Sequence, residues 1–505
     1  MKKNLFVSLA LATTFLAVAQ QKNSLLEQSF WKSSPDVTAL KTEIAKGNNP
    51  SASNQMAFDA VVYAINNEAP NETIKFLLEQ HGNTISKLTH DNRIYLHWAA
   101  SKGNLEIVNY LIAKGADINF EDSHGTTPIT FAINAGQKNT AIYDAFFKAG
   151  LDIKKKYKDG ASLLLLSIAN DKDLSLTNYF IAKGLSLKDT DNNGNTAFNY
   201  AARTGNIEFL KTLLQKGVKP TDNAIIIAAQ GSRREANTIE VYQYLVDDLK
   251  LKPTVVSADG ETVLHSLVRK TNQTEIINYF ISKGVDVNKA DNDGNTALIN
   301  AASARDTEVL ELLLSKVKDV NVQNAKGESA LSIAVQSGSP KTVELLLSKK
   351  ANINVLDKDN NNLGYYLIQS YRPQMMGGRG PESSNNAPKE DPFTAKIKLL
   401  QENGLNLAQT QKDGNNLYHF AVLKNDLTLL QKIANLNIDI NTKNKDGLTA
   451  LHKAIMIAKN DSIIKYLLSI GAKKDIKTDF DESAYDLAKE NETLTQNNIS
   501  VEILK

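Results

Sequence analysis

A nine-residue segment recurs along this chain at regular intervals. It reads LIAKGADIN at Leu111–Asn119, FISKGVDVN at Phe280–Asn288 and LLSKKANIN at Leu346–Asn354. The glycines at the equivalent position give the period, because Gly82, Gly115, Gly150, Gly184 and Gly217 lie 33, 35, 34 and 33 residues apart. A fixed period of this length predicts a stack of small units in which each unit contacts only its neighbours.

A single unit, Asp291–Val322, shows how the sequence specifies local structure. Its opening Asp-Asn-Asp-Gly is typical of a tight turn, since Asn and Gly tolerate positive φ. Thr296 is a suitable N-cap for a short first helix, and Thr307–Ser315 has the apolar face of a second helix. In most units a Lys-Gly pair then ends the second helix, with Lys favourable to the helix dipole and Gly suited to the left-handed position.

The repeated unit resembles the ankyrin repeat. The Thr-Pro-Leu-His box of that family is present in partial form, as TTPIT at Thr126–Thr130, TVLH at Thr262–His265 and TALH at Thr449–His452. NLEIVNYL at Asn104–Leu111 matches the second helix of the family. The resemblance implies an all-α ankyrin-repeat solenoid, with helix–turn–helix–hairpin units of about 33 residues in a curved, right-angled stack with short β-hairpin tips. It also implies that the box histidines, His97, His265, His419 and His452, form hydrogen bonds between neighbouring units.

The repeat boundaries suggest a division of the chain. Residues 1–19 have the basic start, apolar stretch and Ala-Val-Ala end of a signal peptide. Residues 20–50 are expected to form an N-terminal cap and first partial repeat, in which Trp31 covers the first apolar face. About 12 repeats fill 51–478, and 479–505 is expected to be a capping half-repeat followed by a tail. The units at 223–256 and 357–410 lack most signature residues, and we expect them to pack less regularly.

Residues 371–393 exceed the period. The spacing from Gly327 to Gly414 is 87, which is two periods of 33 plus 21, and the surplus segment is rich in Pro and Gly. Its composition predicts a disordered insertion near 371–393. Two interpretations stay open, a tolerated flexible loop or a partner-contacting loop with Met375, Met376 and Arg379 as its adhesive part.

Composition argues against most catalytic chemistry. The chain has no Cys, which excludes disulfides and thiol nucleophiles, and it has no close histidine pair with metal-ligand spacing. Phosphate-loop and nucleophile-elbow motifs are absent too, so we expect no enzyme, no metal and no cofactor. The formal net charge of +2 falls to 0 when Lys2 and Lys3 are removed with the signal peptide, and a neutral mature chain has no overall drive toward nucleic acid. Beyond residues 1–19 no stretch predicts membrane insertion, and we expect a monomer.

Binding to a protein partner remains as the expected function. The ankyrin resemblance places partner contacts on the hairpin tips and at the ends of the first helices, facing a concave groove. Mapped onto this sequence, the predicted partner-binding residues are Arg93, Ser101, Lys102, Asn193, Asn195, Arg203, Glu261, Arg269, Lys270, Asn292, Asp293, Asn295, Lys326, Glu328 and Gln336. We therefore expect a non-enzymatic interaction scaffold in the bacterial periplasm. The alternative is a secreted effector that acts on another cell.

Overall fold

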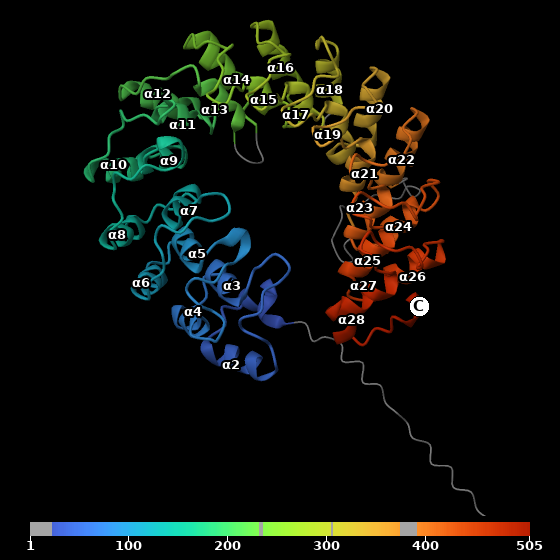
Figure 1. The fold of residues 1–505 in the computed structure, drawn as a ribbon. Coiled ribbons are helices and arrows are strands. Elements are labelled where there is room, and N and C mark those ends of the chain that lie inside the picture. The colour runs from blue at the N-terminus through green and yellow to red at the C-terminus, as the bar shows by residue number, and fades with distance from the viewer. Residues whose placement is uncertain (1–22, 232–235, 305–306, 374–390) are drawn as a thin grey trace, which may run out of the picture. The chain divides into compact units, whose positions relative to one another are not determined.

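The computed structural model describes residues 23–231, 236–304, 307–373 and 391–505. The chain forms two compact units (Figure 1). The first unit contains the described residues up to Ala201 together with Glu208–Pro220. The second contains Ala202–Ile207 and the described residues from Thr221 onward.

The first unit is built from consecutive helix pairs. After the short helices η1 (Ser24–Leu26) and α1 (Gln28–Trp31), its helices are α2 (Val37–Ala45), α3 (Ala60–Asn66), α4 (Asn71–Leu78), α5 (Tyr95–Lys102), α6 (Leu105–Ala113), α7 (Pro128–Asn134), α8 (Thr140–Lys148), α9 (Leu163–Ser167), α10 (Ser175–Ala182), α11 (Ala197–Ala202) and α12 (Ile207–Gln215). The 3₁₀ turns η2 (His90–Asn92), η3 (Lys158–Gly160) and η4 (Ile168–Asn170) lie between them. First helices pack on first helices, as α3 does on α5 and α5 on α7, and second helices likewise pack on second helices.

The second unit continues the same pattern. Its helices are α13 (Ala224–Gln230), α14 (Ile239–Gln243), α15 (Val263–Leu267), α16 (Thr274–Ser282), α17 (Ala297–Ala301), α18 (Thr307–Leu314), α19 (Ala330–Ser337), α20 (Pro340–Ser348), α21 (Leu363–Ser370), α22 (Pro392–Glu402), α23 (Leu417–Leu423), α24 (Leu427–Ile433), α25 (Ala450–Ile457), α26 (Ser462–Ser469), α27 (Ala484–Glu490) and α28 (Glu492–Gln496), followed by η6 (Glu502–Leu504). The first helices from α13 to α27 pack one on the next. The all-α ankyrin-type fold predicted from the sequence is confirmed.

The repeat at Asp291 forms as its sequence predicts. The backbone N–H of Asp291 donates to the Asn295 carbonyl at 2.9 Å and closes the turn. The Thr296 side chain then accepts from the Ile299 N–H at 3.3 Å and begins α17. Leu298 and Leu310 are buried in the interface between helices. At the other end of each repeat the Lys-Gly pair behaves as expected, since Gly115 ends its helix with φ of 89°.

Neighbouring tips are joined through the backbone. The N–H of Lys358 donates to the Lys326 carbonyl at 2.9 Å, and the N–H of Asn292 donates to the Asp259 carbonyl at 2.9 Å. This approach leaves no room for a side chain at Gly327, where a Cβ would lie 2.6 Å from the Lys358 nitrogen and φ is 79°. The tips are turns rather than extended hairpins, because the described residues hold only two isolated β-bridges, Ser53–Asp59 and Gln323–Ser329.

The two ends of the array carry buried aromatic or aliphatic side chains. Trp31 is fully buried, and its indole N–H donates to the Leu25 carbonyl at 2.9 Å. At the other end the expected half-repeat is a full helix pair, because α28 follows α27 directly. Leu494 and Leu504 are buried in the segment that we expected to be a tail.

Both ends of the predicted insertion are among the described residues. Met375, Met376 and Arg379 lie outside the described residues, but the predicted segment 371–393 is ordered at both ends. Tyr371 and Phe393 are buried and their rings meet edge to face, with centroids 5.5 Å apart. Asp391 caps α22 by accepting from the Thr394 N–H at 3.1 Å. The sequence misplaced these boundaries because Asp-Pro-Phe, read here as the end of a loop, begins a helix.

The repeat at 223–256 is irregular, as its weak signature indicated. Its second helix α14 passes into a π-helix, η5 (Tyr244–Asp248), which has one residue more per turn. Lys250 then adopts φ of 60°. The buried side chains of this segment, Tyr242 and Leu245 among them, nevertheless keep the repeat within the stack.

Candidate interaction surface

The box histidines form structural hydrogen bonds. The Nε2 atoms of His265, His419 and His452 lie 3.0 Å from the backbone carbonyls of Asn295, Leu448 and Ile476, each in the following turn. Their Nδ1 atoms accept from the N-cap backbone, at 3.0 Å from Thr262 N in the case of His265. Burial lowers the pKa of His419 to about 4 and also lowers the pKa of His452. His419 and His452 therefore hold repeats together in their neutral form.

His97 differs from the other box histidines. Its Nε2 bonds to the Thr126 carbonyl at 3.0 Å, but its Nδ1 is buried without a hydrogen-bond partner of normal geometry. The N-cap of this repeat is Ile94, which has no side-chain oxygen. Burial lowers the pKa of His97 as well.

Arg93, which we predicted to bind a partner, is buried inside the first unit. Its Nε donates to Asp122 at 2.8 Å and its Nη1 to Asp91 at 2.9 Å. The guanidinium also lies over the rings of Phe131, at 4.4 Å, and Trp98, at 5.4 Å. A side chain with this many internal contacts fixes one tip against the next and is not available to a partner.

Asn195 is also buried, at 6% exposure. Its amide donates to Asp191 Oδ2 at 2.8 Å, while Asp191 Oδ1 accepts the backbone N–H groups of Asn193 and Asn195. Asn295 plays the same part beside Asp291, at 3.2 Å. In these two tips the Asp and Asn residues at positions one and five therefore build the turn.

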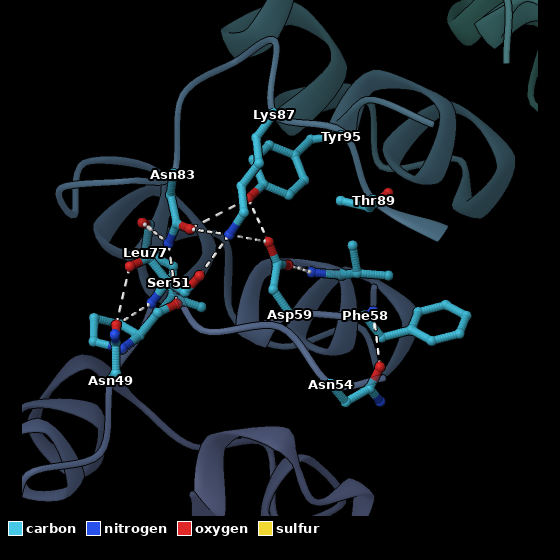
Figure 2. A network of polar contacts seen from close by, with 12 residues as sticks. Asn49, Ser51, Asn54, Phe58, Asp59, Leu77, Asn83, Lys87, Thr89 and Tyr95 are labelled. Atoms are coloured by element: carbon cyan, nitrogen blue, oxygen red, sulfur yellow. Dashed lines mark hydrogen bonds and ion pairs between the residues drawn. The ribbon is translucent and has the colours of Figure 1, made fainter. Parts of the chain in front are cut away.

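A buried ion pair holds the first repeats together (Figure 2). The Asp59 carboxylate is fully buried and lies 2.7 Å from Lys87 Nζ. The Tyr95 hydroxyl donates to the same carboxylate at 2.6 Å, and the Val62 N–H donates to its other oxygen at 3.0 Å. Lys87 also donates to the Ser51 carbonyl at 2.8 Å. Every partner comes from the protein itself, so this cluster is structural.

The other predicted residues lie at or near the surface. Arg203 and Lys270 both contact Gln230, by bonds of 3.0 Å to its side chain and 2.7 Å to its carbonyl. Burial and the charge of Arg203 lower the pKa of Lys270. Ser101, Glu261, Glu328 and Gln336 are half-buried, and the exposed members are Lys102, Asn193, Arg269, Asn292, Asp293 and Lys326.

Three predicted residues meet in one pocket of the second unit. Lys326, Glu328 and Gln336 line a hollow of about 350 Å³ between the tips and first helices of two neighbouring repeats. The next repeat supplies the rest of its wall: Asp357, Lys358, Asp359, Asn361, Tyr365 and Tyr366. The pocket therefore combines two aromatic rings, amides and both signs of charge, as protein-binding surfaces do.

Hydrogen bonds divide the pocket into fixed and available groups. Asp357 accepts from the Tyr366 hydroxyl at 2.9 Å and from the Asn361 amide at 3.0 Å, so its oxygens are occupied. Burial, and then Asp357 itself, raises the pKa of Tyr366. Glu328 lines the pocket, and its Oε2 accepts from the Asn324 amide at 2.9 Å, which leaves the carboxylate with capacity to accept further bonds.

Sequence reasoning missed Tyr365 and Tyr366. Tyr365 occupies the histidine position of its box, and its ring packs edge to face on Phe420 at 5.3 Å. Counting 33 residues from Gly327 would have located the tip at Asn360, which adopts φ of 63° in place of glycine. The repeat period therefore predicts the position of this tip even though the box motif is missing from the repeat.

Within the described residues, no group of three or more His, Asp or Glu side chains has the geometry to hold a metal ion. Within the same residues, no helix combines the length and apolar character needed to span a bilayer.

The sequence matches a family described as Ankyrin repeats (3 copies) over residues 60–156, 139–224, 264–359 and 390–478. The chain belongs to the ankyrin repeat family. Repeats of this family indicate a scaffold for interaction between proteins, which agrees with the surface described above.

Curated relatives are matched over very different shares of their own length. "Palmitoyltransferase AKR1" of Lachancea kluyveri is 34% identical over 30% of this chain and 21% of its own length. "Probable 26S proteasome regulatory subunit p28" of Saccharomyces cerevisiae is 26% identical over 28% of this chain and 64% of its own length. "Putative ankyrin repeat protein YahD" of Escherichia coli is 27% identical over 37% of this chain and 94% of its own length.

The match to the first of these relatives covers about a fifth of that protein, and an L-asparaginase of Dirofilaria immitis is matched over 26% of its length. The similarity is therefore to a part of each of these two proteins, and this chain spans only that part of their length.

Proposed function

We propose that the protein is an exported scaffold that binds a protein partner through its second unit, with the Lys326–Tyr366 pocket at the centre of the contact. The observation that carries the proposal is the convergence of Lys326, Glu328 and Gln336 on one hollow beside Tyr365. Partner contacts at the tips and first-helix ends were expected from the sequence, and here the two kinds of position meet.

The pocket suits a polypeptide surface for two physical reasons. Lys326, Lys358 and Asp359 are exposed on rigid tips, so a partner that binds them orders few mobile side chains. Tyrosines supply large contact area with only two rotatable side-chain bonds, which is why they often dominate binding energy. The mixed charge gives register and specificity rather than attraction to a polyanion.

Capture of the partner from the native cell envelope would test this proposal. The tagged wild type is compared with a Lys326→Glu/Gln336→Ala/Tyr365→Ala variant, with the captured proteins quantified by mass spectrometry. A Lys102→Ala/Asn193→Ala variant in the first unit is the matched control. We expect a loss of at least tenfold in one specific partner for the pocket variant alone. Full retention of every partner would contradict the assignment.

The proposal of export rests on the composition of residues 1–19, which lie outside the described residues. Mass spectrometry of the N-terminus after expression in a Gram-negative host should find a chain that begins at Gln20. Fractionation of the same culture then distinguishes a periplasmic scaffold from the secreted alternative. A full-length chain in the cytoplasm would contradict export.

A further inference from the structure

One position of the repeat changes character near the C-terminal end of the second unit. It lies four residues after the box position, at or next to the end of each first helix, and is defined here as the end position. The end position is polar in most repeats, as at Ser101, Arg269, Gln336 and Gln369. It is large and apolar in two adjacent repeats, where it is Leu423 and Met456.

These two residues belong to an exposed apolar cluster. Leu423 and Met456 are each 54% exposed, Ile457 is 40% exposed and Leu427 is 36% exposed. The helices α23 and α25, which carry three of these four residues, pack directly on each other. We name Leu423, Leu427, Met456 and Ile457 the C-terminal apolar patch. Contiguous exposed apolar surface of this kind commonly marks an interaction site.

Three cations beside the patch have no acidic partner within the described residues. Arg372 Nη1 donates to the Gln369 carbonyl at 2.7 Å, and Lys424 Nζ donates to the Gln369 side chain at 2.8 Å, both neutral acceptors. Lys459 follows Ile457 by two residues and is exposed. Burial, and then the charge of Arg372, lowers the pKa of Lys424, so Arg372 and Lys424 repel each other.

The nearby acids are already engaged or lie in the next repeat. Asp426 accepts from the Tyr371 hydroxyl at 2.9 Å and caps α24. Asp461 pairs with Lys465 at 2.7 Å. Glu490 and Glu492, at and after the end of α27, are exposed and belong to the next repeat. Among the described residues no ion pair neutralises Arg372, Lys424 or Lys459, so positive charge lies beside the patch.

We propose that the C-terminal apolar patch binds an amphipathic helix of a partner protein, with Asp or Glu beside the apolar stripe of that helix. Packed helices lie about 8–10 Å apart, so Leu423 and Met456 present two apolar anchors at about that spacing. Residues seven apart on a helix are separated by about 10.5 Å along its axis, which matches. Acidic residues beside the stripe would neutralise Lys424 and Lys459.

A partner helix fits this surface better than an anionic lipid surface. The patch is confined to two repeats, and its two leading residues are held in register by packed helices. A bilayer needs no such register. This inference rests on the protein-binding role proposed above, but it uses residues separate from the Lys326–Tyr366 pocket. An experiment can therefore contradict one of the two proposed binding sites without contradicting the other.

Two synthetic 18-residue helical peptides test the proposal. Both carry the same leucine stripe at seven-residue spacing, flanked by Glu in one and by Lys in the other. Binding of the full chain to fluorescein-labelled peptide is measured by fluorescence anisotropy. We expect saturable binding of the Glu peptide and at least tenfold weaker binding of the Lys peptide. The Leu423→Ser/Met456→Ser variant should lose at least tenfold in affinity for the Glu peptide, and Lys424→Gln/Lys459→Gln at least threefold.

The matched control is Ser303→Asn, which alters the same end position in another repeat, outside the Lys326–Tyr366 pocket, and should leave the affinity unchanged. All substituted residues are exposed or half-buried, and circular dichroism confirms that each variant is folded. Equal binding of the two peptides, an unchanged affinity of the Leu423→Ser/Met456→Ser variant, or no saturable binding would overturn the proposal. Sedimentation with phosphatidylserine vesicles, in the absence of Glu-peptide binding, would assign the patch to a membrane instead.

Discussion

The repeat of α5 in the first unit and the repeat of α25 in the second solve the same structural problem differently. In the second unit Thr449 caps α25, and His452 bonds both to that cap and to the next turn. In the first unit Ile94 provides no side-chain cap, although His97 keeps its bond to the next turn. The Asp59–Lys87 and Arg93–Asp122 ion pairs supply further contacts between the repeats. The comparison teaches that the box motif is one of at least two ways to lock adjacent repeats, and that the second way uses buried charge.

The largest effect should come from breaking the buried charge. Asp59→Ala leaves Lys87 and the Tyr95 hydroxyl without their shared acceptor in the protein interior. We expect a loss of about 3–5 kcal/mol in the free energy of unfolding of the first unit, as for other buried pairs that lose one partner. Urea unfolding followed by circular dichroism measures it. Asp293→Ala, on an exposed tip, is the control and should change stability by less than about 0.5 kcal/mol.

A loss below about 1 kcal/mol for Asp59→Ala would mean that the ion pair does not hold the first repeats together. The first unit would then depend on apolar packing alone, and the contrast between the two units would disappear.

The hydrogen bonds of the neutral box histidine His419 should make the stability of the second unit fall in acid. The folded pKa of His419 is about 4 and the unfolded value about 6.5, so between these values the unfolded chain binds more protons. The stabilisation is complete above about pH 6.5 and is lost as pH falls toward about 4, by roughly 3 kcal/mol. Urea midpoints at pH 7 and pH 4.5 measure it. His419→Gln should reduce this pH dependence, whereas the exposed His81→Gln should preserve it.

Removing the Thr449 side-chain cap alone tests a smaller contribution, the bond between the N-cap residue and the His452 backbone. Thr449→Val keeps the volume of the side chain but removes the oxygen that accepts from the His452 N–H at 3.3 Å. We expect a loss of about 1 kcal/mol in the free energy of unfolding. Thr495→Val on exposed α28 is the control for β-branching. Equal effects of the two substitutions would show that the cap adds nothing beyond the histidine.

The smallest effect should come from an exposed contact that both units share. Asp144 accepts from the Tyr179 hydroxyl at 2.8 Å and pairs with Lys183, and Asp247 does the same with Tyr279 and Lys283. Lys183 lowers the pKa of Asp144. Asp144→Asn should therefore cost only about 0.5 kcal/mol above pH 5, and less in high salt, because solvent screens the pair. A loss that is independent of salt would contradict an electrostatic origin.

The sequence predicted the repeats because their signals are local. The Lys-Gly ends and the box histidines are each recognised from residues within one repeat, and Gly284 and His265 behave as expected. Side-chain contacts between two repeats could not be predicted in the same way. Arg93 was assigned to the surface because its partner Asp122 lies 29 residues away in the next tip. Tyr365 was missed because it replaces the histidine by which the box is recognised.

The assignment of partner-binding residues remains a prediction for the exposed members. For Asn195 and Arg93 the geometry assigns a role inside the protein, and no property of a single repeat distinguishes such residues from their exposed equivalents. Burial of such a residue depends on whether a carboxylate or an aromatic ring lies within its reach. Asp191 in the same tip does so for Asn195, and Phe131 in the next repeat does so for Arg93.

The backbone bonds between neighbouring tips give this protein its own set of reporters. The N–H groups of Ser123 and Lys445 are each protected by a carbonyl of the preceding repeat, at 2.9 Å in both cases. Such an amide exchanges with deuterium only when the hydrogen bond between its two neighbouring tips opens. A partner that clamps two repeats together would therefore slow exchange at one tip and leave the others unchanged, which would locate the contact without a structure of the complex.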